Sequence, residues 1–315
     1  MLNVTINEFD TIINLSELAS FSFSLLSQYK SLGIAETYSE QELEQLRTSY
    51  KFILFKAYID ATLRGFLLLK VDVPKFGIIW DWNPIIVASE EENHIANELL
   101  VKCVNFSREH DINRLEVCFT ISNEDLKNLY LKQMQWYKEL GFYKIAEELT
   151  MGFSFEKYIP QEIILNKYSV KTIDQVNTNK LPKIAYKASN NSQDKMFLDL
   201  EEEEKQVMCN KYFDLKQPII RDASFILTRG KKIIGFSIVK TNGPDSELNA
   251  IGIIPKYRNK NLAKSLLQLS LNKLAEKGFS RIILDVIKDN YPAYNLYLSL
   301  GFSIINTNLI YALNL

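Results

Sequence analysis

The sequence repeats one outline of apolar runs and short motifs, and this repetition constrains its fold more than any other feature. Ala96 in the first copy corresponds to Ala263 in the second, and Gly141 corresponds to Gly301. The offset between the copies shrinks by seven residues from the first pair to the second, which predicts an insertion in the first copy within 122–135. The other matches are Gly65-Phe66 with Gly235-Phe236, 95–100 with 262–267, and 137–142 with 297–302. We predict two copies of one fold, with chance similarity of amphipathic helices as the alternative.

Chain length and composition agree with two domains. A chain of 315 residues with 47% hydrophobic residues can fill two cores of ordinary size. Ile159-Pro160 interrupts a strand pattern before a new apolar segment begins, so we expect a boundary there. The predicted domains are 1–157 and 158–315.

The second half alternates strand and helix patterns. A strand, a loop, a helix and a further strand in this order form a crossover unit, which predicts an α+β fold with a mixed sheet. The predicted elements are strands at 225–227, 233–239 and 248–254, a helix at 262–274, a strand at 281–287, a helix at 293–300, and a closing hairpin of 302–305 with 309–313.

The charge balance excludes several partner classes. With 37 basic and 38 acidic residues, the chain has no overall field that would attract nucleic acid or an anionic membrane. Its start lacks a basic region followed by an apolar core, and no apolar run approaches membrane-spanning length. We expect a soluble, cytoplasmic protein whose partner is a small molecule or a peptide, with no nucleic acid and no membrane.

Metal and hydrolase chemistry have little support. Three cysteines and two histidines (Cys103, Cys118, Cys209, His94 and His110) lie at spacings that match no metal site or disulfide framework. No Gly-x-Ser-x-Gly motif is present. We therefore expect neither a metal ion nor a nucleophilic serine.

Residues 253–263 place a basic turn between a strand and a helix. Unpaired N–H groups at a helix start, together with the positive end of its dipole, can bind a pyrophosphate. Arg258 and Lys260 would add positive charge, and Lys264 would assist from the first turn. A solvated turn is the alternative for this segment alone.

A second segment, 290–302, follows the next strand, so its polar residues emerge where crevices form in open sheets. Its pattern, Asn290-x-x-Ala293-x-x-Leu-Tyr297-x-x-x-Gly301-Phe302, follows the basic turn in order and spacing. Together the two segments resemble the GNAT acyltransferase superfamily, whose loop reads Arg/Gln-x-x-Gly-x-Gly/Ala. The resemblance covers the C-terminal half of the chain.

The resemblance implies a fold, a cosubstrate and a set of site residues. It implies two tandem GNAT-like folds, each a splayed mixed sheet flanked by helices, with acetyl-CoA as cosubstrate and no metal. Pantetheine would pair with the backbone of Ile253 and Ile254 between two splayed strands. Tyr297 would face the coenzyme sulfur, with packing against Tyr294 as its alternative role. The remaining coenzyme contacts would come from Arg258, Asn259, Lys260, Asn261, Leu262, Ala263, Lys264, Asn290 and Ala293.

Two departures from the family pattern carry expectations. Asn259 and Asn261 stand at loop positions where glycine is usual, and asparagine enters positive φ more readily than other residues, so we expect the loop to keep its shape. In the first copy, Glu91 replaces Arg258 within a run of three glutamates, which would repel a pyrophosphate. We therefore predict a degenerate first domain, in which Trp80, Trp82 or Trp136 could line an acceptor pocket.

The acceptor base is the least determined part of the site. Glu247 and Asn249 would share the side of the strand that bears Ile251 and Ile253, and Glu247 could accept an amine proton. A solvated strand start is the alternative. The predicted function is acetyl transfer from acetyl-CoA to a primary amine by direct attack, and the alternative is a non-catalytic acyl-CoA-binding or interaction module. The acceptor, the acyl chain length and the oligomeric state stay open.

Overall fold

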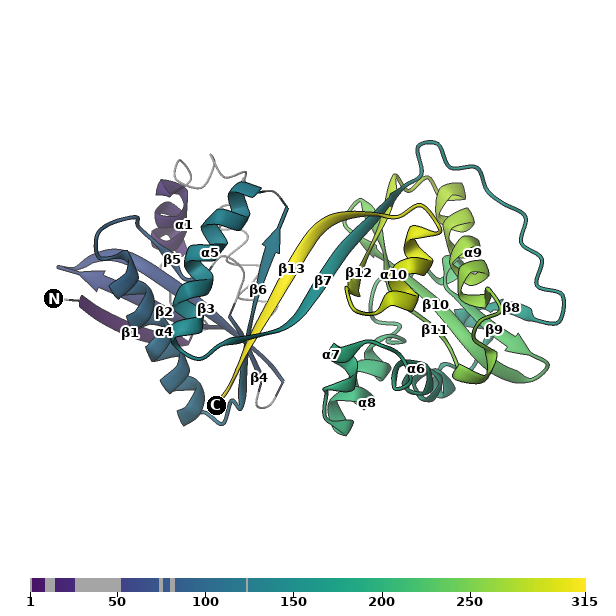
Figure 1. Ribbon diagram of the computed structural model, residues 1–315, viewed down its shortest axis with the longest axis horizontal. Helices are drawn as coiled ribbons and strands as arrows, with labels where there is room; N and C mark the ends of the chain where they lie inside the picture. Colours follow the sequence, from purple (N-terminus) through teal and green to yellow (C-terminus); the bar gives the residue numbers. More distant parts are fainter. Residues whose placement is uncertain (1, 9–14, 26–51, 74–75, 80–82, 123) are drawn as a thin grey trace. The chain divides into compact units, whose positions relative to one another are not determined.

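The computed structural model describes residues 2–8, 15–25, 52–73, 76–79, 83–122 and 124–315. The chain forms two compact units (Figure 1): unit 1 comprises Met1–Ile145 with Asn308–Leu315, and unit 2 comprises Ala146–Thr307. Along the sequence, unit 2 begins twelve residues before the predicted start at residue 158, and residues 308–315 belong to unit 1. Trp80 and Trp82 lie outside the described residues.

Unit 1 is a mixed sheet with helices. Its sheet runs in the order β1-β2-β3-β4-β6, followed by the C-terminal part of β13; only β4 and β6 pair in parallel among the registers described. Its core gathers Phe55, Leu67 and Leu99 with Tyr137, and Tyr311 of the C-terminal segment joins them. The elements are β1 (Leu2–Glu8), α1 (Leu15–Ser24), β2 (Phe52–Ile59), β3 (Thr62–Val73), β4 (Phe76–Ile79), β5 (Ile85–Ile86), α4 (Glu92–Glu109), β6 (Arg114–Ile121) and α5 (Glu124–Glu139).

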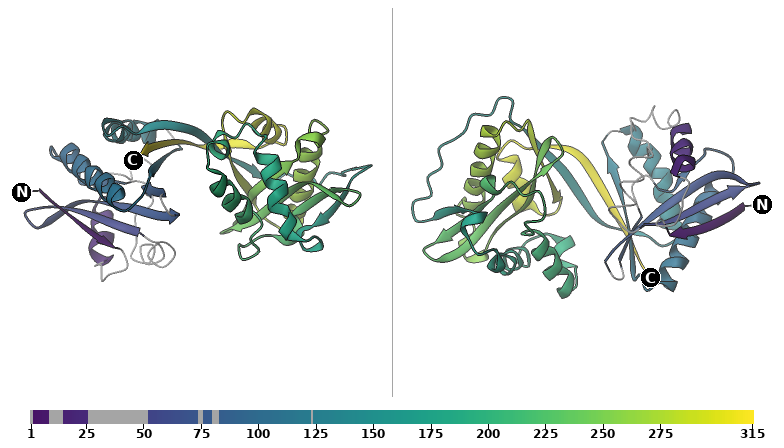
Figure 2. Two further views of the ribbon diagram at one scale, coloured as in Figure 1. Left: turned by 90° about the horizontal axis from the view of Figure 1, so that it is seen from below. Right: turned by 180° about the vertical axis from the view of Figure 1, so that it is seen from behind.

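In unit 2 the strands run in the order β7-β12-β11-β10-β9-β8, with β11 and β12 parallel and the other pairs antiparallel. Helices α9 and α10 lie on one face, and α6 to α8 lie on the other (Figure 2). The elements are β7 (Tyr143–Ser154), β8 (Ser169–Thr172), α6 (Leu181–Ser189), α7 (Lys195–Leu198), α8 (Glu202–Lys211), β9 (Phe225–Arg229), β10 (Lys232–Asn242), β11 (Asp245–Ile253), α9 (Leu262–Glu276), β12 (Arg281–Ile287), α10 (Tyr291–Leu298) and β13 (Ser303–Asn314).

The strands and helices predicted between 225 and 300 are confirmed, and β12 has the predicted bounds. The closing hairpin is wrong, because β13 is one continuous strand that contributes to both units. The residues between the two expected hairpin arms, 306–308, belong to the same strand, so the chain stays extended through them. Among the described residues, no helix combines the length and apolar character needed to span a membrane.

The predicted duplication is confirmed by strand register. Gly65 of β3 pairs with Ile86, and Gly235 of β10 pairs with Ile253, as the repeat requires. Both glycines allow a close approach: a Cβ would lie 2.9 Å from the Ile85 carbonyl oxygen at Gly65 and 2.8 Å from the Gly252 carbonyl oxygen at Gly235. Helix α5 has 16 residues and α10 has 8, so the insertion of the first copy lies in its last helix.

Candidate functional site

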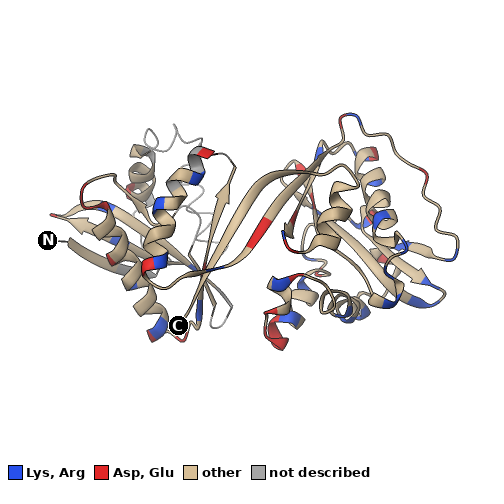
Figure 3. Cartoon of the chain, in the orientation of Figure 1, with Lys and Arg blue, Asp and Glu red and all other residues tan. Residues whose placement is uncertain are grey.

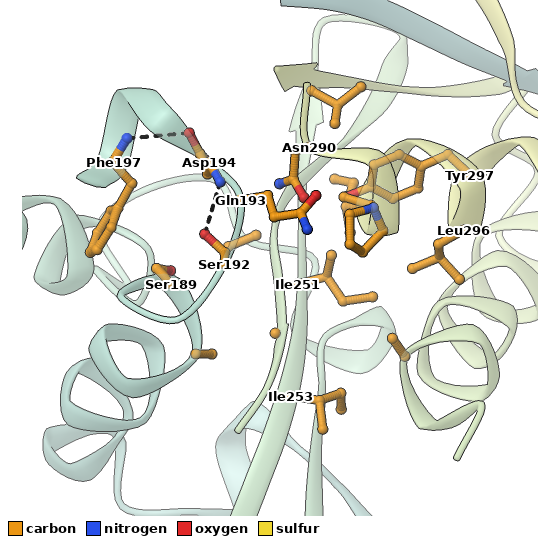
Figure 4. Close-up of a pocket in the computed structure, with 18 of the residues that line it drawn as sticks. Ser189, Ser192, Gln193, Asp194, Phe197, Ile251, Ile253, Asn290, Leu296 and Tyr297 are labelled. Atoms are coloured by element: carbon orange, nitrogen blue, oxygen red, sulfur yellow. Dashed lines mark hydrogen bonds between the residues drawn. The ribbon is translucent and has the colours of Figure 1, made fainter. Parts of the chain in front are cut away.

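Strands β11 and β12 separate soon after they meet. They pair only at Ser246 with Ile282 and at Glu247 with Ile283, so β11 has a free edge from Leu248 onward. A cleft of about 840 Å³ opens along this edge, lined only by residues of unit 2. Figure 4 shows Ile251 and Ile253 of β11 between the segment before α7 and helix α10. The splay expected between these two strands is confirmed.

The backbone of β11 presents alternate residues to this free edge. The Ile254 N–H donates to the Ile234 carbonyl at 3.0 Å, toward β10. Because alternate residues of an antiparallel strand direct their backbone groups to opposite sides, Ile251 and Ile253 direct theirs toward the open edge. Ile253 lines the cleft and Ile254 does not. The edge open to a ligand is therefore the Ile251 backbone and the Ile253 N–H, because Arg258 Nε donates to the Ile253 carbonyl at 3.0 Å and the Ile254 N–H is bonded to β10.

A β-bulge at Asn249 changes the alternation of β11. Ile238 of β10 pairs with Ala250 and the next residue, Val239, pairs with Leu248, so Asn249 has no opposite residue. An extra residue reverses the side-chain faces beyond it. Glu247 therefore lies on the opposite sheet face from Ile251 and Ile253, contrary to our expectation that they share a face.

Glu247 is also absent from the cleft lining. Its Oε1 lies 2.9 Å from Lys240 Nζ, and its Oε2 accepts a hydrogen bond from Asn242 at 3.3 Å. Both carboxylate oxygens are thus engaged away from the cleft. Glu247, which we expected to accept the amine proton, therefore does not lie with the predicted site residues that line the cleft.

The loop before α9 has the predicted conformation. Asn259 has φ 59° and Asn261 has φ 56°, so both adopt the left-handed region expected of them. The first helical hydrogen bond joins the Ser265 N–H to the Asn261 carbonyl at 2.9 Å. The N–H groups of 262–264 precede it and face the start of the helix. Leu262, Ala263 and Lys264 all line the cleft, which brings an anion-binding helix start to one of its ends.

Arg258 holds this loop in place. Its guanidinium donates to three backbone carbonyls: Nε to Ile253 at 3.0 Å, Nη1 to Asn191 at 2.5 Å and Nη2 to Ala188 at 2.6 Å. Burial lowers the pKa of Arg258. The side chain thus ties the loop to α6 and the turn after it, which differs from the mobile phosphate-binding cation that we expected.

Lys260 lies outside the cleft lining, on the exposed side of the loop. Lys260, Lys232 and Arg229 approach the Tyr257 ring, at 5.6, 5.7 and 6.0 Å from its centroid. Lys264 lines the cleft, with its Nζ 3.4 Å from the Ser299 carbonyl. Figure 3 shows basic residues gathered around the turn between β9 and β10. This end of unit 2 is therefore positively charged.

The second predicted segment reaches the same cleft through α10. Asn290, Ala293 and Tyr297 all line it. Tyr297 is only 5% exposed, and no hydrogen bond joins its hydroxyl to another described residue. Burial raises the pKa of Tyr297 well above that of a free phenol, and the nearby Asp194 and Tyr212 add to this rise. Figure 4 shows the ring extending from α10 toward Asn290.

Sequence reasoning missed the residues that complete the cleft. Asp194 is the N-cap of α7 and accepts from the Phe197 N–H at 3.2 Å, and both Asp194 and Tyr212 line the cleft. Glu148 and Asp285 line the cleft from β7 and β12. A signal for Asp285 was present, since it is the only charged residue inside the apolar run 282–287. Within the described part of the chain, no three His, Cys, Asp or Glu side chains gather to hold a metal.

Unit 1 lacks the corresponding loop. Helix α4 begins at Glu92 with Glu91 as its N-cap, so the residues equivalent to the Asn259–Asn261 turn form the first helical turn instead. Three glutamates therefore occupy the helix start. Tyr137, the counterpart of Tyr297, donates its hydroxyl to the Asn83 carbonyl at 2.7 Å.

Comparisons with known proteins agree with this architecture. Residues 192–302 match the Acetyltransferase (GNAT) family. Mycothiol acetyltransferase of Corynebacterium glutamicum (strain R) is 34% identical over 83 residues, 26% of this chain and 28% of that protein. The chain thus spans less than a third of this relative.

Solved structures share the whole fold at low identity. A tandem GNAT protein from the clavulanic acid biosynthesis pathway has a TM-score of 0.64 and 13% identity, covering 100% of this chain and 98% of its own. A GCN5-related N-acetyltransferase from Sphaerobacter thermophilus has a TM-score of 0.63 and 11% identity, covering 99% and 95%. The fold is therefore a tandem pair of GNAT folds, and the match to the Acetyltransferase (GNAT) family lies within unit 2.

Proposed function

We propose that unit 2 transfers an acetyl group from acetyl-CoA to a primary amine of a small molecule or peptide. The observation that carries this proposal is the cleft itself, because it joins a free strand edge at Ile251 and Ile253 to the start of α9. The free edge suits the amide-bearing pantetheine arm, and the helix start suits its pyrophosphate. Similarity of residues 192–302 to acetyltransferases supports the same reaction.

The residues of unit 2 have separate tasks in this reaction. The N–H groups at the start of α9, with Leu262, Ala263 and Lys264, would bind the pyrophosphate, and Arg258 would fix the loop that presents them. Asn290 and Ala293 would border the pantetheine at the start of α10. The acceptor amine would attack the thioester carbon directly, so no covalent enzyme intermediate forms.

Tyr297 would protonate the departing thiolate. Its hydroxyl is buried, lines the cleft and bonds no other described residue, so it is available to a ligand. Its raised pKa keeps the phenol protonated at neutral pH. A protonated donor beside the sulfur favours collapse of the tetrahedral intermediate toward products.

Unit 1 would be a degenerate copy that binds no coenzyme. Three glutamates at the start of α4 oppose a pyrophosphate, and the Tyr137 hydroxyl is already bonded to Asn83. We also propose that the domain boundaries lie near the limits of units 1 and 2, and that the protein is cytoplasmic.

The test is release of free CoA thiol from acetyl-CoA in the presence of a panel of primary amines. Mass spectrometry of ligands retained by the purified chain would select the donor, and longer acyl-CoA esters would define its chain length. Amine-dependent thiol release supports the enzyme. Coenzyme binding without turnover on any amine would instead favour a non-catalytic acyl-CoA-binding module.

A further inference from the structure

Asp285 presents a carboxylate to the cleft from the sheet face that faces α6 to α8. Ile282, Leu284 and Val286 pack in the core on the α9 side, so Ile283 and Asp285 point to the other face. Asp285 lines the cleft, and its Oδ1 accepts a hydrogen bond from Thr150 Oγ1 at 2.7 Å. No other hydrogen bond or ion pair of Asp285 is found among the described residues. One oxygen is thus held, and the other has no hydrogen bond to a described residue.

Glu247 stands beside Asp285 on the same face, since Glu247 pairs with Ile283 across the two strands. It differs in its contacts, because Lys240 and Asn242 engage its two oxygens and it does not line the cleft. Of the two neighbouring carboxylates, only Asp285 is therefore open to a ligand.

The surroundings of Asp285 favour proton uptake. Asp285 is exposed to the open cleft, yet partial desolvation by its neighbours raises its pKa, the negative charge of Glu247 raises the pKa further, and Thr150 and Lys240 act in the opposite direction. Glu148 of β7 also lines the cleft, on the strand that pairs with β12. A carboxylate with a raised pKa is a stronger base than an ordinary aspartate.

We propose that the Asp285 carboxylate receives the acceptor amine and takes its proton, and this inference rests on the proposed acetyl transfer. An acceptor ammonium would give one proton to Asp285, which later passes it to solvent, and the neutral amine would attack the thioester carbon. The new C–N bond forms as the carbonyl becomes an oxyanion. When the C–S bond breaks, nitrogen loses a second proton and the thiolate gains one, so one proton is released per turnover.

The charges of the cleft also define the acceptor class. Its carboxylates are Glu148, Asp194 and Asp285, while its basic residues, Arg258 and Lys264, belong to the α9 loop and first turn. An anionic group close to the acceptor amine would meet like charge away from that loop. The site therefore suits a cationic alkylamine without a neighbouring carboxylate or phosphate.

Asp285→Asn tests the role directly, because it keeps the size of the side chain and the bond from Thr150. With 1,4-diaminobutane, glucosamine and a tripeptide amine as acceptors, we expect kcat/KM to fall about 10²-fold or more. Glu247→Gln should keep most of the rate. Acetyl-CoA affinity, measured by calorimetry, should be equal in both variants and wild type, which shows that each variant is folded.

The pH profile separates a base from a structural residue. Activity requires ionised Asp285, so kcat/KM rises as pH rises through its pKa. Glu247→Gln removes a negative neighbour and should move this acidic limb to lower pH. Thr150→Val removes a hydrogen bond that stabilises the carboxylate and should move the limb to higher pH. An unmoved limb in both variants would overturn the assignment.

Binding of n-butylammonium to the CoA-loaded chain gives a readout that does not need turnover. We expect Asp285→Asn to weaken this binding at least several-fold and Glu247→Gln to leave it unchanged. If wild type turns over amines while Asp285→Asn retains full rate and n-butylammonium affinity, the Asp285 assignment is wrong and acetyl transfer stands. If wild type turns over no amine, the proposed function fails, and retained n-butylammonium binding in Asp285→Asn would overturn the binding role as well.

Discussion

Tyr137 and Tyr297 occupy equivalent positions in the two units, yet of the two hydroxyls only that of Tyr137 bonds another residue in the part of the chain that the structure describes. Tyr137 donates to the Asn83 carbonyl at 2.7 Å and is fully buried in the core of unit 1. Tyr297 lines the cleft of unit 2, and its hydroxyl bonds no other described residue. The same residue type at the same point of the fold thus packs a core in one copy and faces a cleft in the other.

Tyr297→Phe should lower kcat on the order of 10²-fold with little change in acetyl-CoA affinity, because it removes the proton donor and keeps the ring. Burial raises the pKa of Tyr297. We therefore expect no loss of rate from ionisation of Tyr297 at any pH below the pKa of a free phenol. Initial rates of thiol release under chemistry-limited conditions check this. A wild-type rate would make Tyr297 a packing residue.

Tyr137→Phe is the matched control in unit 1. It removes the bond to Asn83 and should cost about 1 kcal/mol of unfolding free energy without changing turnover. Denaturant unfolding monitored with the activity assay measures both. A rate loss equal to that of Tyr297→Phe would contradict the division of roles between the units.

Arg258→Lys should weaken coenzyme binding through the loop rather than through lost phosphate contact. A lysine cannot bridge the carbonyls of Ile253, Ala188 and Asn191 together, so we expect a stability loss of about 2 kcal/mol along with reduced affinity. Lys260→Met, which removes an exposed charge, should leave stability unchanged. Reduced affinity in Arg258→Lys at unchanged stability would return Arg258 to a direct phosphate role.

Asn261 tests the shape of the loop. Asn261 has φ 56°, a conformation that glycine adopts freely and valine does not. Asn261→Gly should therefore preserve acetyl-CoA affinity, whereas Asn261→Val should lower the free energy of unfolding by about 1–2 kcal/mol and weaken binding. Thermal unfolding and calorimetry on the two variants check this. Equal behaviour of glycine and valine would show that the loop geometry does not matter for the site.

Local patterns predicted much of this molecule, whereas long-range contacts set what they missed. The elements between 225 and 300, the positive φ of Asn259 and Asn261, and the place of Tyr297 follow from residues near one another in sequence. Two of the three carbonyls bonded by Arg258, those of Ala188 and Asn191, lie 70 and 67 residues away, and no local pattern encodes them.

Strand register was the other source of error. The bulge at Asn249 depends on how β11 pairs with β10, and it moved Glu247 away from the face of Ile251. The same limit applies to β13, whose continuity is set by neighbouring strands rather than by its own turn-like residues. Asp285 was visible in sequence only as a lone charge in an apolar strand.

Tyr311 tests the assignment of the C-terminal residues to unit 1. It is 6% exposed and packs in that core with Phe119, whose ring centroid lies 5.8 Å away. Tyr311→Ala should destabilise unit 1 by about 3–4 kcal/mol and leave acetyl-CoA binding intact. Calorimetric unfolding, recorded with and without acetyl-CoA, measures the stability of the two units and the effect of coenzyme binding on it. Loss of coenzyme binding with unchanged unfolding would contradict the assignment.

Titration calorimetry of acetyl-CoA into the full chain tests the central claim most directly. We predict one site per chain, with affinity reduced roughly tenfold or more by Lys264→Glu, since glutamate suits a helix start but repels a pyrophosphate. Asn97→Glu, at the equivalent position of α4, should change nothing. A stoichiometry of two, or a Lys264→Glu affinity equal to wild type, would contradict a single coenzyme site at the start of α9.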